Sequence, residues 1–523
     1  MCGIAAIMDL HRDTESAGRT AAREDVLVSM LDRIRYRGDP ENFAERWSGP
    51  GVALGTNRLA IVDRAHGRQP QCDPSGQVQL VYNGELYGFG RLRDQLRSRG
   101  HEFRTCSDTE VVLHAYLEWG DSCVARLDGM FAFVLYDGRR RHFLAARDHV
   151  GIKPLYYAAE EGTHCFASEQ KCLLEHGTQI RTVLPGTYVT ETGTTRYYGL
   201  GEPAGSPLPK RQAVARYREL FDDAVRKQVD TDLPVAVTFS GGVDSAAVLH
   251  TAMKYHPDVT AVTIGLEGAA DVEVAQRYCK EFDVPHLVAR LDRAALIDVI
   301  DDVVYGAEFF EPIDAMDTCV GYFAFLLAKE NGFKLALCGE GSDEVMAGYD
   351  LFRSHPDPQD LMRYRVGNLH RTDLQRVDRS SMLNSVETRV PFMDRALLEF
   401  AYALPMSLKM HEGQEKWLLR AAFADSLPDY VRQRPKVRMP DGSGMQNTLV
   451  EYAREAMTAT TGPGSPHPDA TGPHAGGDGP DMQTPEGVFF LSKYLAAGFP
   501  MPKERFKRAG FDYSANGYFE FIS

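Results

Sequence analysis

The sequence Thr238-Phe-Ser-Gly-Gly-Val-Asp-Ser245 overlaps an apolar, β-rich run, residues 233–239, and leads into a helix-forming segment. A strand, a glycine-rich turn and a helix N-terminus together form an anion site, because glycines let the backbone approach the ligand and the first helical N–H groups are free. Ser240 and Ser245 add hydroxyl donors. Asp244 places a carboxylate in this site, which indicates a divalent cation between the carboxylate and a phosphate.

This stretch lacks the G-x-x-x-x-G-K-[ST] pattern of the Walker loop. S-G-G-V-D-S resembles the loop of the ATP-pyrophosphatase superfamily, whose members cleave ATP between its α and β phosphates to adenylate a substrate. The resemblance implies that ATP contacts Ser240, Gly241, Gly242, Asp244 and Ser245. The alternative is an ordinary glycine-rich turn between a strand and a helix, and the rest of the chain decides between them.

Bulk composition bounds the remaining possibilities. A chain of 523 residues is too long for one core and predicts two or three domains. The net charge of −15 argues against general binding to nucleic acid or to an anionic membrane. Nine cysteines without a C-x-x-C pair predict no disulfide framework or zinc site, and fit a reducing cytoplasm. We find no signal segment and no apolar run long enough to span a membrane.

The chain opens with Met1-Cys2 followed by a β-like run. The residue after Met1 is small, so an aminopeptidase would leave Cys2 at the new N-terminus. Such a cysteine carries a thiol nucleophile and an α-amine base on one residue, and the two titrate at about pH 8.5 and about pH 8. A strand that simply begins with cysteine is the alternative.

Four polar residues downstream suit a free α-amino acid. Arg58 could hold its carboxylate, while Glu85 and Asp108 could hold its ammonium. Asn83 with the N–H group of Gly84 could form an oxyanion hole. The structural alternatives are that Asp108 only caps a helix and that Arg58 sits in a surface ion pair.

Seven motifs now occur in order. They are M-C-G-I, R-L-A-I-V-D, N-G-E-L-Y, S-D-T-E, L-D-G-M-F-A-F, R-D-H-V-G-I-K-P-L-Y-Y and F-A-S-E-Q-K. Together they resemble the class II glutamine amidotransferase domain, an N-terminal-nucleophile hydrolase. The resemblance implies an αββα sandwich that hydrolyses glutamine to glutamate and ammonia. It also implies that Cys2 is the nucleophile, that Asn83 and Gly84 form the oxyanion hole, and that Arg58, Asn83, Glu85 and Asp108 bind glutamine.

Two positions depart from that family's pattern. Tyr36-Arg-Gly-Asp-Pro40 stands where the family usually has H-R-G-P-D, and Gly88 stands where N-G-E-[IL]-Y-N ends in Asn. Neither change removes a residue with an expected chemical role.

The second half of the chain alternates strands and helices after a Pro/Gly-rich linker. This order predicts a doubly wound parallel sheet whose ligands bind at the carboxyl ends of the strands. The phosphate loop, the strand end at Ile264 and the loop that begins at Gly339 would meet there. Asp343 would join Asp244 as a Mg²⁺ ligand, and Glu340 would be the base for the attacking amine. A solvated turn is the alternative for the acidic loop.

Positive charge follows in Arg379 and Lys436, which we expect near the pyrophosphate leaving group. The ordered motifs S-G-G-V-D-S, G-E-G-S-D-E-V-M-A-G-Y, V-E-T-R-V-P-F-M-D, E-K-W-L-L-R and R-P-K, after a class II glutaminase, are similar to glutamine-hydrolysing asparagine synthetase. The resemblance implies ATP and Mg²⁺ as co-substrate and cofactor, an acyl-adenylate intermediate, an internal ammonia tunnel and an adenine nucleotide alpha hydrolase-like second domain. It places the glutaminase at 1–200, a linker at 201–212 and the synthetase at 213–523.

The acceptor is the open question. Segment 308–319 is acidic and apolar, whereas the resembling family has a Thr/Arg/Ser-rich stretch, and a pocket for aspartate should present a cation. Aspartate remains the first expectation. The alternatives are another carboxylic acid of specialised metabolism and a non-catalytic homologue that only binds nucleotide. The family resemblance also suggests a homodimer. The Gly/Pro-rich segment 461–485 should be a flexible loop, and residues 486–495 resume a helical pattern.

Overall fold

The computed structural model describes residues 1–523 except 11–16, 178, 202–207, 267, 462–483 and 502–523. It divides into two compact units. The first comprises Met1–Pro234, Phe333–Leu335 and Asn384–Pro405, and the second comprises Val235–Gly332, Ala336–Leu383 and Met406–Ser523. Residues 202–207 of the expected linker 201–212 and residues 462–483 of the expected loop 461–485 lie outside the described residues. The described end of the expected linker, from Lys210, is already helical.

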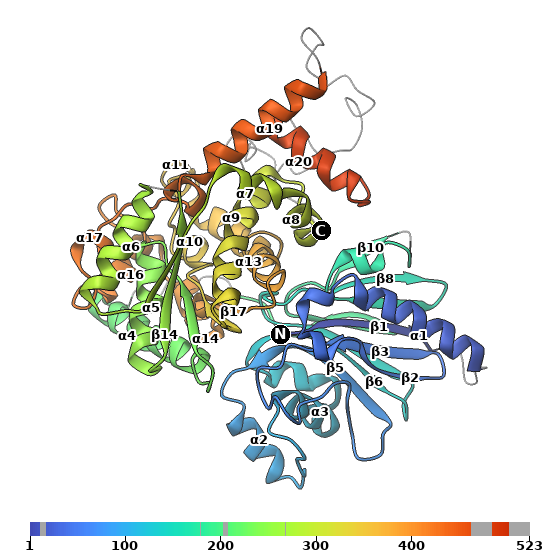
Figure 1. The fold of residues 1–523 in the computed structure, drawn as a ribbon. Coiled ribbons are helices and arrows are strands. Elements are labelled where there is room, and N and C mark those ends of the chain that lie inside the picture. The colour runs from blue at the N-terminus through green and yellow to red at the C-terminus, as the bar shows by residue number, and fades with distance from the viewer. Residues whose placement is uncertain (11–16, 178, 202–207, 267, 462–483, 502–523) are drawn as a thin grey trace. The chain divides into compact units, whose positions relative to one another are not determined.

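Two six-stranded sheets form the first unit (Figure 1). One sheet has the order β10 (Ile180–Thr182), β8 (Tyr156–Glu160), β9 (Thr163–Ala167), β1 (Gly3–Asp9), β3 (Val52–Asn57) and β2 (Glu45–Gly49). The other has the order β12 (Gly193–Arg196), β11 (Thr187–Thr190), β7 (His142–Arg147), β6 (Gly129–Asp137), β5 (Val78–Leu86) and β4 (Gln71–Cys72). The pairings recorded within both sheets are antiparallel.

Hydrophobic side chains sort this unit into four layers. Ile4 and Ala6 of β1 pack against Val81 and Val134 of the facing sheet. Alternate residues of a strand face opposite sides, so Ala5 and Ile7 of β1 instead contact α1 (Ala17–Asp32). On the outer face of the second sheet lies α3 (Asp108–Trp119). The layers are therefore helix, sheet, sheet, helix, and the predicted αββα sandwich is confirmed.

Nine further elements complete the first unit. They are α2 (Gly90–Arg97), the 3₁₀ turns η1 (Arg35–Arg37), η2 (Pro40–Asn42), η3 (Gly120–Arg126) and η4 (Gln170–Leu173), and the later elements α4 (Lys210–Gln228), β17 (Glu387–Arg389), η6 (Pro391–Met393) and α14 (Arg395–Ala403). Packing thus groups α4 and the segment Asn384–Pro405 with the αββα sandwich. The predicted domain boundaries at 200 and 213 stay a prediction about the chain's modules, since the units follow contacts rather than sequence order.

A parallel sheet is the centre of the second unit. Its strands β15 (His286–Arg290), β14 (Val259–Gly265), β13 (Val235–Thr238) and β16 (Leu335–Leu337) lie in that order. β13 and β15 both pair in parallel with β14. Helices α5 (Val243–Tyr255), α6 (Ala270–Glu281) and α9 (Pro312–Glu330) pack on these strands. The predicted α/β class is confirmed, because each strand is followed by a helix.

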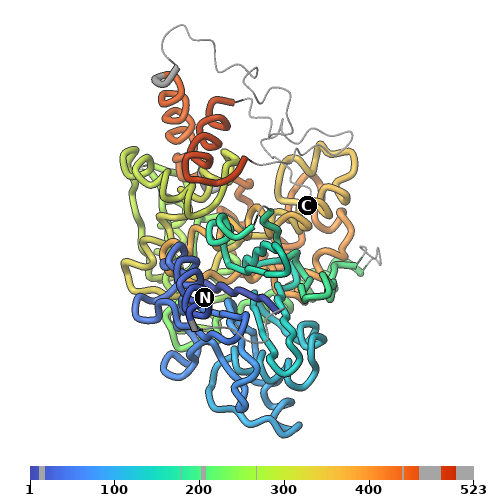
Figure 2. Tube along the Cα trace, turned by 90° about the vertical axis from the view of Figure 1, so that its right-hand side faces the viewer, coloured from blue at the N-terminus to red at the C-terminus, as the bar shows by residue number. Residues whose placement is uncertain are grey.

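The remaining helices of the second unit surround this sheet. They are α7 (Arg293–Asp298), α8 (Ile300–Ala307), α10 (Ser342–Val345), α11 (Leu351–Ser354), α12 (Pro358–Asn368), η5 (Leu369–Arg371), α13 (Asp373–Met382), α15 (Met406–Lys409), α16 (Trp417–Ala422), α17 (Asp429–Arg432), α18 (Met439–Gly442), α19 (Met445–Thr461) and α20 (Pro485–Ala496). α19 and α20 lie side by side in both views (Figure 1, Figure 2). None of the helices in the described ranges has the length and apolarity needed to cross a bilayer.

Candidate active sites

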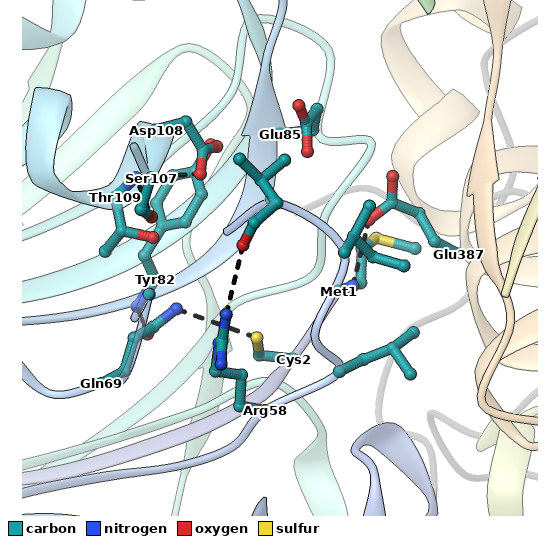
Figure 3. Close-up of a pocket in the computed structure, with 15 residues that line it drawn as sticks. Met1, Cys2, Arg58, Gln69, Tyr82, Glu85, Ser107, Asp108, Thr109 and Glu387 are labelled. Atoms are coloured by element: carbon teal, nitrogen blue, oxygen red, sulfur yellow. Dashed lines mark hydrogen bonds and ion pairs between the residues drawn. The ribbon is translucent and has the colours of Figure 1, made fainter. Parts of the chain in front are cut away.

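A cavity of about 320 Å³ in the first unit brings together most residues predicted for glutamine hydrolysis. Cys2, Arg58, Gly84, Glu85 and Asp108 all line it (Figure 3). They come from the start of β1, the residue after β3, the end of β5 and the start of α3. The two-sheet sandwich therefore brings residues that are far apart in the sequence together at one cavity.

Cys2 is buried beside this hollow, at 5% exposure. Burial raises the pKa of its thiol, against the smaller lowering effects of the N-terminal ammonium and of Arg58. The amide nitrogen of Gln69 lies 3.9 Å from the Cys2 sulfur. The thiol is thus protonated near neutral pH, and a nucleophilic role needs a base that takes its proton.

Of the two polar atoms in the Asn83 side-chain amide, one forms a hydrogen bond and the other does not. Its Oδ1 accepts the backbone N–H of Cys2 at 2.9 Å. Its buried Nδ2 has no hydrogen-bond partner among the described residues. A buried donor without a partner is costly, and an oxyanion beside Cys2 would satisfy it. Gly84 follows in β5, where a Cβ atom would lie only 2.3 Å from the carbonyl oxygen of Met130.

The Arg58 guanidinium is fixed by backbone rather than by a surface ion pair. It donates to the carbonyl oxygens of Val62, Asp63 and Arg64 at 3.2, 3.0 and 3.2 Å. Its exposed fraction is 4%. Arg58 is therefore held in place as an uncompensated cation at the wall of the cavity, which suits a substrate carboxylate.

Two buried carboxyl groups face the same cavity. Burial raises the pKa of Glu85 well above its usual range, although Arg389 acts against this, and burial also raises the pKa of Asp108. The helix cap is Ser107 rather than Asp108, whose Oδ2 accepts the N–H of Leu86 at 3.1 Å. A substrate ammonium between these carboxyl groups would stabilise their ionised forms.

The altered motif Tyr36–Pro40 forms a buried network behind the nucleophile. The Arg37 guanidinium donates to the Cys2 carbonyl oxygen at 3.2 Å and to Glu169 at 2.6 Å. The Tyr36 hydroxyl donates to the same Glu169 carboxylate at 2.5 Å, and Lys171 also pairs with it. Tyrosine thus supplies a hydrogen bond at this altered position. Gly88 has φ of +57°, a conformation that glycine and asparagine both adopt, which explains the exchange.

A larger cavity, of about 690 Å³, opens in the second unit at the carboxyl ends of the strands. Its lining includes eight of the predicted residues: Ser240, Asp244, Ser245, Ile264, Gly339, Glu340, Asp343 and Lys436. Gly339 lets the two loops meet, because its Cβ would lie 3.0 Å from the Ser245 backbone nitrogen.

The phosphate loop has the geometry of an anion site. Gly241 has φ of +72°, which favours glycine, and Gly242 is the residue before α5. Neither glycine lines the cavity, whereas the hydroxyl of Ser245 does and donates to the Gly242 carbonyl at 3.2 Å. The N-terminal turn of the 13-residue helix α5 therefore lies at this end of the cavity, where Asp244 and Ser245 line it.

Lys416 joins the two carboxylates predicted to bind a metal. Its Nζ lies 2.5 Å from Asp244 Oδ2 and 2.6 Å from Asp343 Oδ1. Lys436 contacts the other oxygen of Asp343 at 2.8 Å. Two carboxylate oxygens this close, beside a phosphate site, are a donor set that fits Mg²⁺ when phosphate oxygens complete its shell. The described residues contain no cluster of three or more His, Cys, Asp or Glu side chains that could hold a metal alone.

Glu340 has the protonation behaviour of a base. Burial raises its pKa to about 7, against the lowering effect of Arg376. Its Oε2 lies 3.7 Å from the Arg376 guanidinium. A carboxyl group with a pKa near neutrality is a better proton acceptor than an ordinary glutamate.

Arg379 does not reach this cavity. Its side chain is fully buried and pairs with Glu308 at 3.1 Å and Asp378 at 3.2 Å. The predicted contact between Arg379 and pyrophosphate therefore has no support in the geometry. The cations that the structure places there are Lys436, as expected, and Lys416.

Comparison with known proteins places the chain in a family. Residues 1–193 match the family model of the glutamine amidotransferase domain, and residues 216–363 and 353–471 match that of asparagine synthase. The chain is 33% identical to asparagine synthetase [glutamine-hydrolyzing] 2 of Arabidopsis thaliana, over 88% of this chain and 82% of that protein. It is 32% identical to the asparagine synthetase of Zea mays, with coverages of 85% and 78%. The chain belongs to the glutamine-hydrolysing asparagine synthetase family. The predicted enzyme class is thereby confirmed.

In the segment 308–319 of this chain, acidic side chains pair with arginines. Arg376 contacts Asp314 at 3.0 Å and Asp317 at 3.2 Å. Arg438 donates to both oxygens of Asp317 at 2.7 and 2.8 Å. Burial raises the pKa of Asp314 to about 6 and that of Glu311 to about 8. Arg376, which lies beside Glu340, is thus already engaged by acids of the protein.

Several residues at the two cavities escaped the sequence interpretation. They are Gln69, Glu387 and Arg389 in the first unit, and Lys416 and Arg376 in the second. Lys416 lies within E-K-W-L-L-R, a motif that marks the family but does not reveal which residue faces the site. Glu387 lies in V-E-T-R-V-P-F-M-D, and only the packing of this segment into the first unit shows its place in the glutamine cavity.

Proposed function

We propose that this chain is an ATP- and glutamine-dependent amidotransferase that converts a carboxylic acid into a carboxamide. The observation that carries the proposal is that one chain holds two built cavities. One contains a buried cysteine beside an unsatisfied amide donor, and the other contains a phosphate loop beside paired lysines and acids.

In the first cavity, the Cys2 sulfur attacks the side-chain carbonyl carbon of glutamine and forms a thioester. Asn83 Nδ2 and the Gly84 N–H stabilise the oxyanion, and Arg58, Glu85 and Asp108 hold the amino-acid end of the substrate. Ammonia leaves, and water then hydrolyses the thioester to glutamate. This chemistry requires removal of Met1, so that the α-amine of Cys2 is free to take the thiol proton.

In the second cavity, an oxygen of the acceptor carboxylate attacks the α-phosphorus of ATP, and pyrophosphate leaves. Lys436 and Lys416 stabilise the negative charge on the leaving group. Asp244 and Asp343 would hold Mg²⁺, which neutralises phosphate charge when bound. Ammonia then attacks the acyl-adenylate, Glu340 takes the proton of the attacking nitrogen, and AMP leaves. Residues of the phosphate loop bind and orient the nucleotide.

Aspartate is the first candidate acceptor, because the curated relatives are named asparagine synthetases. A second candidate, another carboxylic acid of specialised metabolism, is favoured by a specific observation. Arg376, which lies beside Glu340, is engaged by Asp314 and Asp317, and Arg438 is engaged by Asp317. Aspartate, in contrast, brings a second carboxylate that needs a cation. We place the reaction in the cytoplasm, where the chain would act as a homodimer.

The proposal is tested by measuring pyrophosphate release with Mg-ATP and glutamine across a panel of carboxylic acids that includes aspartate. Stimulation by aspartate with formation of asparagine supports the first candidate. Stimulation only by another acid, with its amide as product, supports the second. Folded protein that shows no glutaminase activity and releases no pyrophosphate with any acid would contradict the amidotransferase function and leave the nucleotide-binding homologue.

A further inference from the structure

Glu387 lines the glutamine cavity although it comes from Asn384–Pro405, a late segment of the chain that packs in the first unit. Its carboxylate Oε2 lies 3.0 Å from the ammonium of Met1, and both groups are buried (Figure 3). Its Oε1 accepts the Nε–H of Arg389 at 2.7 Å. One oxygen of this carboxylate is therefore aimed at the first amino group of the chain.

Removal of Met1 changes what this oxygen faces. Bond lengths limit two consecutive backbone nitrogens to about 3.7 Å apart, so the nitrogen of Cys2 lies close to the position of the Met1 nitrogen. As a free amine, the Cys2 nitrogen keeps its hydrogen bond to Asn83 Oδ1, 2.9 Å away. Its other protons point into the space that Met1 occupied, and Glu387 forms the wall of that space.

We propose that Glu387 is a positioning residue of the glutaminase, which binds the α-ammonium of Cys2, directly or through water, and so supports transfer of the thiol proton to this amine. The inference rests on the proposed hydrolysis of glutamine by Cys2. Glu387 does not touch the glutamine amide, and it acts through the amine of the nucleophile.

The chemistry explains why an anion is useful at this place. The thiol gives its proton to the amine, which yields a thiolate and an ammonium within one residue. The thiolate attacks the side-chain carbonyl carbon of glutamine and forms the sulfur–carbon bond. The ammonium then gives the proton to the amide nitrogen as the carbon–nitrogen bond breaks and ammonia leaves. Burial raises the pKa of the Cys2 thiol and opposes the first transfer. A carboxylate beside the amine stabilises the ammonium and offsets that effect.

Other charged groups face the same amine. Glu85 and Asp108 also line this cavity, and burial raises the pKa of each. Although burial opposes ionisation of Glu387, the N-terminal ammonium, Arg389 and Lys153 lower its pKa to about 2. The cations Arg58 and Arg389 act against an ammonium here, so the permanent negative charge of Glu387 provides the compensation.

The test compares full-length wild type with Glu387→Gln, Glu387→Asp and a control, Glu399→Gln. Glu399 lies in the same segment, pairs with Arg395 on the surface and lies outside the glutamine cavity. Glutamate release from glutamine alone is measured between pH 5.5 and 9, after mass spectrometry confirms removal of Met1. Ammonia-dependent pyrophosphate release by each variant reports whether the second site is intact.

We expect Glu387→Gln to lower kcat of the glutaminase about tenfold, the equivalent of one pKa unit. We also expect the acid limb of its kcat/KM profile to shift to lower pH, because the amine loses a group that raises its pKa. Glu387→Asp keeps the charge and should show a smaller shift in the same direction, and Glu399→Gln should match wild type. If Glu387→Gln does not fold, the pH profile of Glu387→Asp alone tests the inference.

An unchanged pH profile in the folded Glu387 variants, with wild-type kcat or with equal loss at all pH values, would overturn the inference. A shift to higher pH would also overturn it. These outcomes differ from failure of the proposed function, in which wild type itself releases no glutamate, or Cys2→Ala releases as much as wild type.

Discussion

The two cavities of this chain differ in how their charges are arranged. In the first, the buried Arg58 and two carboxyl groups with raised pKa values line a cavity, and burial raises the pKa of the Cys2 thiol beside them. In the second, two lysines are already paired with two aspartates, and burial raises the pKa of Glu340 to about 7. This difference indicates that the first site suits a zwitterion. A polyanion that binds in the second site would have to rearrange the existing ion pairs.

The largest effect is expected at the base of the second cavity. Glu340→Gln should lower the rate of amide formation about 10³-fold, because the amide side chain cannot accept the proton of the attacking nitrogen. In wild type, amide formation should rise with pH through about 7, since Glu340 is active only when ionised and burial raises its pKa to about 7. The measurement is the pH profile of ammonia-dependent synthesis. A wild-type rate for the variant would remove Glu340 from this role.

A slightly smaller effect is expected for Lys436, the lysine that lines the second cavity. Lys436→Met should lower pyrophosphate release by roughly 10² to 10³, because an electrostatic contact to the leaving group is lost in the transition state. Glutaminase activity should stay unchanged. Arg379→Met serves as the contrasting variant: it lies outside the cavity, so its loss should appear as unfolding at lower denaturant, through the uncompensated buried Glu308.

In the first cavity, Asn83→Ala should lower kcat for glutamate release about 10²-fold, with a small change in KM. The reason is that the unsatisfied Nδ2 donor gains its partner only when the oxyanion forms. Ammonia-dependent synthesis is the matched control and should not change. A rise in KM alone would instead make Asn83 a binding residue for glutamine.

The smallest effect is expected in the network behind Cys2. Arg37→Lys should lower glutaminase kcat about tenfold, because lysine cannot bond both the Cys2 carbonyl and Glu169 with the fixed fork of a guanidinium. Tyr36→Phe, which removes the hydroxyl contact to Glu169, should cost less. Steady-state kinetics of glutamate release measures kcat of both variants. Equal losses of kcat would show that the effect of this network does not decrease with distance from Cys2.

The sequence was sufficient for the sandwich, the parallel sheet and most residues of both cavities. In motifs such as N-G-E-L-Y and S-G-G-V-D-S, the site residues lie within one strand end or one loop. Their positions therefore follow from the local sequence. Glu387 and Lys416 were not predictable in this way, because their positions depend on how distant segments pack. Arg379 shows the opposite case: its motif suggested a phosphate contact, but helix α13 buries it against Glu308.

The central claim is that one chain holds two separate sites joined only by ammonia. It is tested most directly by Cys2→Ala, assayed for pyrophosphate and amide formation with glutamine and with ammonia as alternative nitrogen sources. The account predicts loss of glutamine-dependent synthesis by more than about 10³-fold, with ammonia-dependent synthesis close to wild type. Loss of both activities from folded protein would contradict the two-site account.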